Sequence, residues 1–487
     1  MSYEVVVVGG GIGGLMVAAL LAKRGVNVCL FERQPELGGC ISSVQHHGLT
    51  FEPGFGLYTS WEPGDVYNRI FTELGVTAPE VNLLDDEVVI RFGGHDLRLM
   101  KDASFNDELR AAFPECASKA VAFYSTVEHV ASELKRSVEV APLGRKTIFG
   151  KALGAFRTQS DESKLLDQAR TSLTNNFTKE TSDRFVSFID AQLRLFLQTP
   201  IDECPFIPAS VALNRMRQNL YSFVGGPSIL IQRLAEAFKA SGGTLKLNSP
   251  VLRLAYDESG TAIGVDLLSG ERVVATRAIV SNMTVWDTYG KLVGLNRTPS
   301  EVKRHLTSLV STGVFQVFAS MNATALERLP GPRILAIGDR LPEDQSTNFF
   351  FTAMRVNGEE NFGVTLTSQT EVEDWFSFQR DEDDAESRDQ AALEVLWRNL
   401  HQSMPELGPD IEVLETATPK TLYEQTRRKL GYALGYRQQQ SNQPPDTASI
   451  VPKLFLVGDT ASDGIATLDS IARSALALAN TLHPNNR

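Results

Sequence analysis

The stretch VVVVGGGIGGLMVAALLAKRGVNVCLFERQ, residues 5–34, decides the fold. Residues 5–8 are four valines, and such a β-branched apolar run is typical of a strand buried on both faces of a parallel sheet. Five glycines follow within the next six positions, then residues 15–24 have a helical composition and residues 26–32 form a second apolar run. The order strand, glycine loop, helix, strand predicts a βαβ unit at the N-terminus.

The glycine loop has the spacing of a dinucleotide-binding turn. Gly9, Gly11 and Gly14 fit G-x-G-x-x-G, in which the first glycine allows the tight turn, the second lets a pyrophosphate approach the backbone and the third lets helix and strand pack closely. The N–H groups at the start of the helix would face the anion. Glu32 lies about twenty residues further on, where a carboxylate accepts hydrogen bonds from ribose hydroxyls. The alternative is a Rossmann scaffold that has lost its ligand.

Length, charge and cysteine usage narrow the class of protein. A chain of 487 residues is too long for one ordinary core, so two domains are expected. The net charge of −12 argues against a nucleic-acid binder, because phosphate backbones would repel it. The four cysteines show no C-x-x-C pair, which predicts neither a zinc site nor a disulfide framework. With no signal-peptide pattern and no apolar run of about 20 residues, we expect a cytoplasmic protein.

The sequence after Glu32 indicates which dinucleotide is bound. The segment ERQPELGGCISSVQHHGLTFEPG, residues 32–54, carries a second glycine pair, Gly38 and Gly39, and then FEPG. It resembles the flavin-dependent amine oxidase and phytoene desaturase superfamily, in which an acid, a glycine pair and an F-D-x-G motif line the diphosphate and then the flavin ring. Many members have arginine after the second glycine, where this chain has Cys40, and Glu52 stands where aspartate is usual. The resemblance implies FAD.

The C-terminal segment PKLFLVGDTASDGIATLDSIARSALALAN, residues 452–480, supports the same resemblance. It is predicted to be a buried strand at 454–457, the pair Gly458-Asp459, a loop and a long apolar helix. The resemblance implies that Asp459 binds the ribitol chain and that the helix points its N-terminus at the flavin pyrimidine, where a reduced flavin carries negative charge. Asp469 or Ser470 is expected to cap that helix. An ordinary Rossmann strand with a capped helix is the alternative.

A middle segment, residues 220–282, completes the resemblance. It begins with a glycine pair and an amphipathic helix whose apolar residues Leu230, Leu234 and Phe238 are spaced by four. Residues 242–257 then alternate as a strand, and two more strands flank the turn at Ser269-Gly270. The resemblance implies that the backbone of Val251 binds the adenine. A plain layer of β-hairpins would have the same pattern.

These three segments predict an α/β fold with a discontinuous, Rossmann-type FAD-binding domain. It comprises residues 1–75, 220–290 and 420–487, and an interleaved α+β substrate domain comprises 76–219 and 291–419. There is no second G-x-G-x-x-G after a strand, so a separate nicotinamide domain is not expected. The expected FAD contacts are Gly9, Gly11, Ile12, Gly13, Gly14, Glu32, Arg33, Gly38, Gly39, Cys40, Val251, Gly458, Asp459, Ser470 and Ile471.

The chain is most similar to the phytoene desaturase, carotenoid isomerase and retinol saturase branch, through residues 46–76, 98–114 and 418–435. The resemblance implies a hydrophobic polyene substrate aligned on the flavin in an apolar tunnel, with hydride exchange at flavin N5. One alternative is an amine or amino-acid oxidase, in which Tyr423, Tyr432 and Tyr436 would line an aromatic cage instead of packing in the core. The other is a non-catalytic prenyl-lipid-binding protein in the style of the GDP dissociation inhibitors.

The sequence names no catalytic residue, metal site or oligomeric state. His46 and His47 lie on an alternating segment and are interpreted as exposed strand residues.

Residues 143–157, LGRKTIFGKALGAFR, are unusual in this acidic chain because they carry four basic residues and no acid. On a helix, Ile148, Phe149, Ala152, Leu153 and Phe156 would share one face, which is typical of helices that lie on a membrane surface. We expect either peripheral membrane contact or an ordinary surface helix. The basic residues are Arg145, Lys146, Lys151 and Arg157.

Overall fold

The computed structural model describes residues 1–85, 87–99, 104–140, 172–177, 180–338, 348–356, 359–376, 382–433, 435–437, 450–461 and 467–484. The basic segment 143–157 lies outside these ranges.

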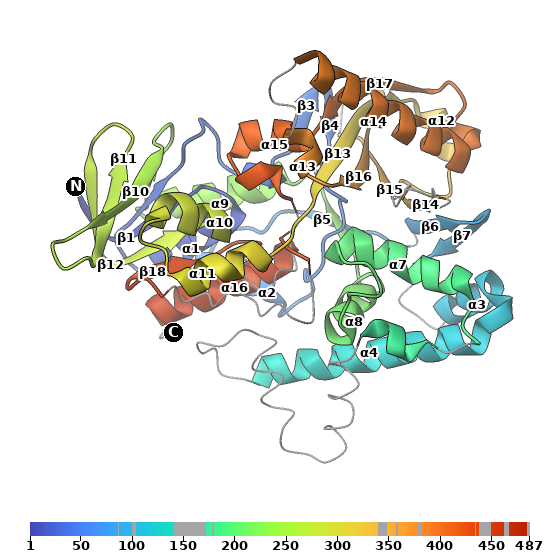
Figure 1. The fold of residues 1–487 in the computed structure, drawn as a ribbon, viewed down its shortest axis with the longest axis horizontal. Coiled ribbons are helices and arrows are strands. Elements are labelled where there is room, and N and C mark those ends of the chain that lie inside the picture. Colours follow the sequence, from blue (N-terminus) through green and yellow to red (C-terminus); the bar gives the residue numbers. More distant parts are fainter. Residues whose placement is uncertain are drawn as a thin grey trace.

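The first sheet joins strands from three distant parts of the chain, on the left of Figure 1. β1 (Ser2–Val8) pairs in parallel with β2 (Val28–Phe31) on one side and with β12 (Arg272–Ser281) on the other, and β9 (Thr244–Lys246) extends the sheet beyond β2. The end of β12 pairs in parallel with β18 (Leu454–Leu456). The start of β12 pairs antiparallel with β11 (Ala262–Leu267), and β11 in turn pairs antiparallel with β10 (Val251–Tyr256). The carboxyl ends of β1, β2, β12 and β18 therefore meet at one edge.

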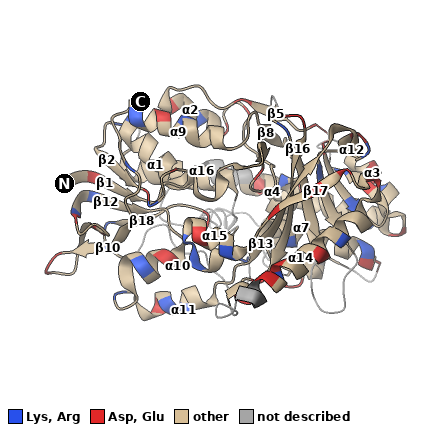
Figure 2. Cartoon of the chain, turned by 90° about the horizontal axis from the view of Figure 1, so that it is seen from above, with Lys and Arg blue, Asp and Glu red and all other residues tan. Residues whose placement is uncertain are grey.

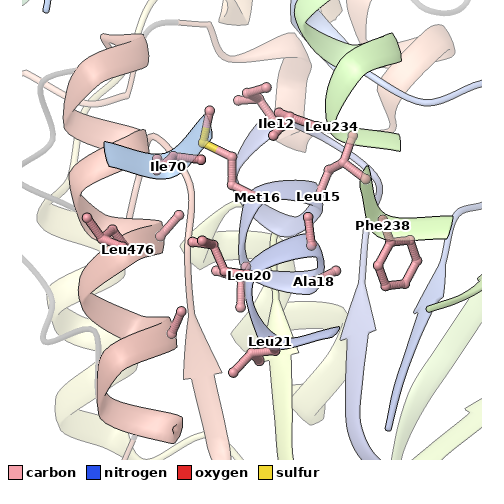
Figure 3. Close-up of a cluster of buried hydrophobic side chains, with 14 of the residues drawn as sticks. Ile12, Leu15, Met16, Ala18, Leu20, Leu21, Ile70, Leu234, Phe238 and Leu476 are labelled. Atoms are coloured by element: carbon pink, nitrogen blue, oxygen red, sulfur yellow. The ribbon is translucent and has the colours of Figure 1, made fainter. Parts of the chain in front are cut away.

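The helix after β1 is the centre of the core on one face of this sheet. α1 (Ile12–Lys23) is buried at every position except Lys23. It packs between α9 (Ser228–Ala240) and α16 (Leu468–Leu482), with α2 (Val66–Leu74) beside it, as Figure 3 shows for Ile70, Leu234 and Leu476. A fully buried leucine contributes about 1.5–3 kcal/mol relative to an exposed one, so this packing holds α1 in place without any side-chain cap.

The opposite face of the first sheet is covered by shorter elements. α10 (Val285–Asp287) and the π-helix η5 (Thr288–Gly294) follow β12 directly and pack under it, and α11 (Ser300–Ser308) comes next along the chain. A parallel sheet with both faces covered is the architecture that the valine run predicts.

The second sheet lies on the right of Figure 1. Its order is β17 (Ile411–Ala417), β13 (Gly313–Met321), β16 (Phe362–Thr370), β15 (Phe349–Met354), β14 (Arg333–Ile337), β6 (Val88–Phe92) and β7 (His95–Arg98). Only the β14–β6 pair within it is parallel. α12 (Ala323–Glu327), α13 (Glu373–Phe376) and α14 (Glu382–Ser403) belong to the same part of the chain.

A helical layer packs against the end of the second sheet. It consists of α3 (Ser104–Ala112), α4 (Ala117–Val140), α7 (Asp183–Leu197) and α8 (Phe206–Arg215). Its core is rich in aromatic residues, including Phe105, Phe113, Phe185 and Phe188, all of which are fully buried.

Two small sheets and one helix connect the halves. β3 (Val44–His46) pairs with β4 (Leu49–Phe51), and β5 (Val81–Leu83) pairs with β8 (Tyr221–Phe223). α15 (Pro419–Thr426) lies between the two large sheets in both views (Figures 1 and 2). Figure 2 also shows that acidic and basic residues are scattered along the ribbon in both halves. None of the helices in the described ranges has the length and apolar character that a bilayer span requires.

The structure differs from the sequence-based expectations at two places. The single strand expected at 242–257 is two strands, β9 and β10, which belong to different parts of the sheet and are separated by a corner where Asn248 has a φ of 51°. Asp469 and Ser470 do not cap α16, because the N-cap residue is Thr467 and both lie inside the first turn. The helix thus begins two residues earlier than predicted, and Asp469 is left to form a different interaction.

Candidate cofactor site

The glycine loop connects β1 to α1 at the edge where the strand ends meet. Gly9 has a φ of +100°, a left-handed conformation that side chains rarely adopt. A Cβ on Gly11 would lie 2.5 Å from Asn282 Nδ2, and a Cβ on Gly14 would overlap the carbonyl oxygen of Gly9. The loop therefore lacks side chains for two reasons. Asn282 and the carbonyl of Gly9 leave no room for a Cβ on one side, and the absence of side chains keeps the N–H groups at the start of α1 accessible on the other.

Asn282 is a site residue that the sequence analysis missed. It follows β12 directly, and its backbone N–H donates to the carbonyl of Val8 over 2.9 Å. Its side-chain oxygen Oδ1 also lies close to two other glycines. A Cβ on Gly13 would be 2.8 Å from this oxygen, and a Cβ on Gly458 would be 3.1 Å from it. The sequence feature that could have identified Asn282 is its position directly after a strand, since that strand pairs with β1.

Glu32 stands at the end of β2 with its carboxylate oriented by the backbone. Oε2 accepts from the N–H of Gly10 at 2.7 Å, and Oε1 accepts from the N–H of Gln34 at 2.8 Å. Each carboxylate oxygen can accept a further hydrogen bond through its second lone pair. The half-buried group is thus held in a fixed position with acceptor capacity left for hydroxyl donors.

The second glycine pair lies against the first loop. The N–H of Gly38 donates to the carbonyl of Gly10 at 3.0 Å, and both Gly38 and Gly39 have positive φ angles, 117° and 59°. Cys40 follows in the short helix η1 (Gly39–Ile41) and is exposed. The side chain of Arg33 has a partner in the protein, since its Nη1 donates to the carbonyl of Gln425 at 3.2 Å.

The segment before β10 runs beside the end of β2. The N–H of Ser249 donates to the carbonyl of Glu32 at 2.8 Å, and that of Asn248 to the carbonyl of Gln34 at 3.1 Å. Val251 begins β10 immediately afterwards. The corner in this segment therefore brings Val251 near the acid that the sequence analysis assigns to the ribose.

Asp459 follows β18 and Gly458, whose φ is +123°. Its carboxylate is paired with Arg428, with Nη1 3.3 Å from Oδ1 and Nη2 bonded to Oδ2. Burial lowers the pKa of Arg428, but the charge and hydrogen bonds of Asp459, together with the nearby Cys40 and Asp287, raise it overall. Arg428 is the second residue that the sequence analysis did not single out.

The first turn of α16 contains a buried ion-pair cluster. Arg215 Nη2, from the end of α8, lies 2.7 Å and 2.6 Å from the two oxygens of Asp469, and Arg473 Nε lies 3.8 Å away. Burial alone would raise the pKa of Asp469, but the charges of Arg215 and Arg473 lower it overall. Two guanidinium groups against one carboxylate leave the N-terminus of α16 with a local positive charge.

Ser470 and Ile471, the two other residues predicted here, also lie in the first turn of α16. The hydroxyl of Ser470 donates to the carbonyl of Thr467 at 2.9 Å. Ile471 is buried, and its Cγ2 lies 3.1 Å from the place of a Cβ on Gly13. The first turn of α16 is thus adjacent to the start of α1.

The loop at 52–56, which includes Glu52, Pro53 and Gly54 of the FEPG motif, is held by hydrogen bonds from the second sheet. Four side chains from four neighbouring strands donate hydrogen bonds to its carbonyls. They are Gln316 of β13 to Pro53 at 3.0 Å, Thr365 of β16 to Glu52 at 2.9 Å, Thr352 of β15 to Phe55 at 3.3 Å, and Arg333 of β14 to Gly56 at 3.2 Å. The loop therefore crosses the sheet from strand to strand and has a fixed position on it.

Glu52 in this loop is a buried carboxyl group. It is 2% exposed and accepts a hydrogen bond from the Tyr58 hydroxyl at 2.7 Å. Burial raises its pKa, although the hydrogen bond from Tyr58 and the charge of Arg333 act in the opposite direction. The carboxyl thus has a partner in the protein and is shielded from solvent.

Other candidate side chains have structural partners. His46 Nδ1 lies 2.8 Å from Glu415, and its ring stacks on Phe318. Tyr432 and Tyr436 are buried in the core under the first sheet, where Tyr432 packs on Trp286. These two tyrosines thus pack, as the sequence analysis considered, and the half-buried Tyr423 lies edge-on against Phe376. Within the described ranges, no group of three or more metal-ligating side chains occurs.

Two surface hollows, of about 530 and 320 Å³, lie on the other half of the molecule. The larger is lined by polar residues of α14 together with Thr416, and the smaller by residues around His47 and Glu412. Neither contains a residue of the glycine loop, so neither extends the site described above.

Comparison with known proteins agrees with the geometry. A family model described as flavin-containing amine oxidoreductase matches residues 12–483. The chain is 24% identical over 485 residues to the chloroplastic prolycopene isomerase of Arabidopsis thaliana, covering 95% of this chain and 80% of that protein. It is 26% identical over 322 residues to the all-trans-retinol 13,14-reductase of Danio rerio, covering 63% of this chain and 52% of that protein.

The solved structure of a putrescine oxidase bound to putrescine covers the whole chain. Its TM-score is 0.68 at 14% identity, and all of both chains is covered. At this identity the likeness concerns the fold alone, and it confirms the predicted Rossmann-type domain with an interleaved substrate domain. The chain belongs to the flavin-containing amine oxidoreductase family and is an FAD-dependent oxidoreductase.

Proposed function

We propose that the protein exchanges a hydride between FAD and a hydrophobic polyene, and so desaturates, saturates or isomerises a carotenoid- or retinoid-like chain. The observation that carries this proposal is the similarity to prolycopene isomerase over 95% of the chain. The retinol reductase is a second relative whose name describes a polyene.

The surroundings of the 52–56 loop support an apolar substrate. Phe55 and Leu57 are only partly buried, and both pack against the aromatic-rich core of the helical layer. Phe55 makes edge contacts with Phe196 and Phe350 at ring-centroid distances of 6.0 and 5.3 Å. A polyene has no polar handle, so an apolar wall next to the loop is the kind of surface that would align it.

We propose that the residues expected from the sequence hold the cofactor. Glu32 would accept from the ribose hydroxyls, the open N–H groups at the start of α1 would face the diphosphate, and Asp459 would accept from the ribityl chain. The positive N-terminus of α16, with Arg215 and Arg473, would favour negative charge on the ring. The bound flavin supplies the hydride chemistry, and the chain supplies orientation and exclusion of water.

The remaining proposed contacts are Gly9, Gly11, Ile12, Gly13, Gly14, Arg33, Gly38, Gly39, Cys40, Val251, Gly458, Ser470 and Ile471. We propose further that residues 1–75, 220–290 and 420–487 form the FAD domain, and that 76–219 and 291–419 form the substrate domain. Residues 143–157, outside the described ranges, are proposed from their composition to contact a membrane surface.

Purified protein, reconstituted with FAD, tests the proposal on polyenes dissolved in liposomes. The expected result is a change in the number of conjugated double bonds or in the cis/trans ratio of the polyene. Chromatography with absorbance detection measures both. The same protein stripped of FAD is the control and should leave the polyenes unchanged.

An absence of change in any polyene, with or without a reductant or a quinone, together with peroxide release from amines would contradict the proposal. That outcome would indicate that the protein is an amine oxidase. None of the observations on the described residues favours them, because Tyr432 and Tyr436 are packed in the core.

A further inference from the structure

Arg428 stands at the cofactor edge on a turn that follows α15. Its side chain is 16% exposed, and each of its three nitrogens has a partner within the protein. Nε donates to the carbonyl of Tyr432 at 2.7 Å, while Nη1 and Nη2 bond the two oxygens of Asp459. The guanidinium also lies near the thiol of Cys40. It therefore connects the end of β18 with the second glycine pair.

The backbone around Arg428 is strained. Arg427 has a φ of 57° and Leu430 a φ of 51°, both in the left-handed region that non-glycine residues seldom occupy. Gly431 follows with a φ of 64°, and a Cβ there would overlap the carbonyl of Pro419. Strain of this kind persists where the surroundings over-determine the backbone, commonly at functional sites.

Asp287 is the group that fixes this strained turn. It is 3% exposed and accepts from the Lys429 N–H at 3.0 Å and from the Thr284 hydroxyl at 2.6 Å. Lys291 Nζ lies 2.7 Å from Asp287 and also donates to the carbonyl of Arg427 at 3.0 Å. The turn is thus tied to α10 and η5, which follow β12, on both sides of Arg428.

We propose that Arg428 is a positioning residue of the FAD site, which holds the side chain of Asp459 oriented toward the ribityl chain. The paired nitrogens of the guanidinium fix the plane of the carboxylate, as in other fork-like arginine–carboxylate pairs. The carboxylate oxygens keep lone pairs for hydroxyl donors. Because all three nitrogens of Arg428 are bonded within the protein, it acts through Asp459 and not as a diphosphate anchor. This inference rests on the FAD site of the proposed function and not on the polyene substrate.

A double-mutant cycle on FAD binding tests the proposal. Apo-protein of wild type, Arg428→Gln, Asp459→Asn and the double variant is titrated with FAD. Each single substitution should weaken binding about tenfold, since a hydrogen bond to a charged group is worth about 1.5–3 kcal/mol. The double variant should bind within about threefold of the single variants, because both remove the same oriented carboxylate.

Arg427→Gln is the matched control. It makes the same change of charge at the next position, where the guanidinium lies over the Tyr423 ring and not on Asp459. Its affinity for FAD should stay within about twofold of wild type. If Arg427→Gln weakens binding as much as Arg428→Gln, general electrostatics explains the effect and the proposal is wrong.

Binding of ADP separates positioning from a structural role. ADP has the adenosine and diphosphate of the cofactor but no ribityl chain, so Arg428→Gln should weaken FAD binding and leave ADP binding unchanged. Equal weakening of both ligands would overturn the proposal, as would additive effects in the double variant or unchanged FAD binding in either single variant. Failure of the polyene assay alone would leave this inference intact, since wild-type FAD binding is measured separately.

Discussion

Glu32 has two tasks at the scale of a single residue, because its carboxylate orients the glycine loop through Gly10 while keeping acceptors for the ribose. We predict that Glu32→Ala weakens FAD binding about 100-fold, the equivalent of two charge-assisted hydrogen bonds at the lower end of their usual range. Titration of apo-protein with FAD measures this. Glu32→Gln keeps an acceptor oxygen of the same reach and should bind with intermediate affinity. An unchanged dissociation constant in the alanine variant would mean that the ribose is held elsewhere.

Gly11 and Asn282 are predicted to be coupled. Gly11→Ala should lower the free energy of unfolding by about 1–3 kcal/mol, because its Cβ would lie 2.5 Å from Asn282 Nδ2. Adding Asn282→Ala removes that nitrogen and should restore part of the loss. Gly14→Ala is the comparison, since its Cβ meets the backbone oxygen of Gly9 and a second substitution at Asn282 should not rescue it. Urea unfolding of the four variants checks this, and equal rescue in both pairs would contradict it.

At the scale of elements, the first turn of α16 should make stability depend on pH. The folded-state pKa of Asp469 lies below its ordinary value, so its contribution is present above about pH 4 and is lost as pH falls through the lowered folded value. We predict that the free energy of unfolding of Asp469→Asn falls less steeply on acidification than that of wild type. Chemical unfolding from pH 7 to pH 3 measures this. The matched control is Asp202→Asn on the exposed turn after α7, which should keep the wild-type slope.

The 52–56 loop depends on the second sheet for its carbonyl hydrogen bonds. Thr365→Val keeps the shape of the side chain but leaves the buried carbonyl of Glu52 without its donor, so the free energy of unfolding should fall by about 1–3 kcal/mol. Thr307→Val on the exposed face of α11 is the control and should be nearly neutral. If FAD absorbance also shifts in Thr365→Val alone, the loop lies next to the flavin. A neutral Thr365→Val would show that water replaces the hydroxyl.

At the scale of the whole molecule, the basic segment 143–157 stands out against a net charge of −12. Each basic residue near an anionic membrane contributes about 1 kcal/mol, so four would give reversible association that weakens with salt. We predict that the protein floats with anionic liposomes and that a variant with glutamate at Arg145, Lys146, Lys151 and Arg157 does not. Equal flotation of both proteins, or of neither, would make the segment an ordinary surface helix.

The sequence alone determined the parts of this protein that are encoded locally. The valine run, the glycine spacing, Glu32 and the pair Gly458-Asp459 each lie within one short segment, and backbone geometry restricts which residues those segments accept. The parallel pairing of β1 with β2, and the packing of α1 on them, therefore agreed with expectation. Where the pattern was ambiguous, as in residues 242–257, an alternating run was assigned to one strand although it forms two, β9 and β10.

Only the tertiary structure decided which single polar residues join the site. Asn282, Arg215 and Arg428 have no local signature, because a lone asparagine or arginine looks the same on any surface. Arg215 meets Asp469 across 254 positions of sequence, and Asn282 lies against the glycine loop because it directly follows the strand that pairs with β1. Buried charges and amides are stable only with partners, and those partners are chosen by the packing of distant elements. The sequence pattern therefore predicted the backbone of the site, whereas the charged and polar side chains around it became known only from the folded structure.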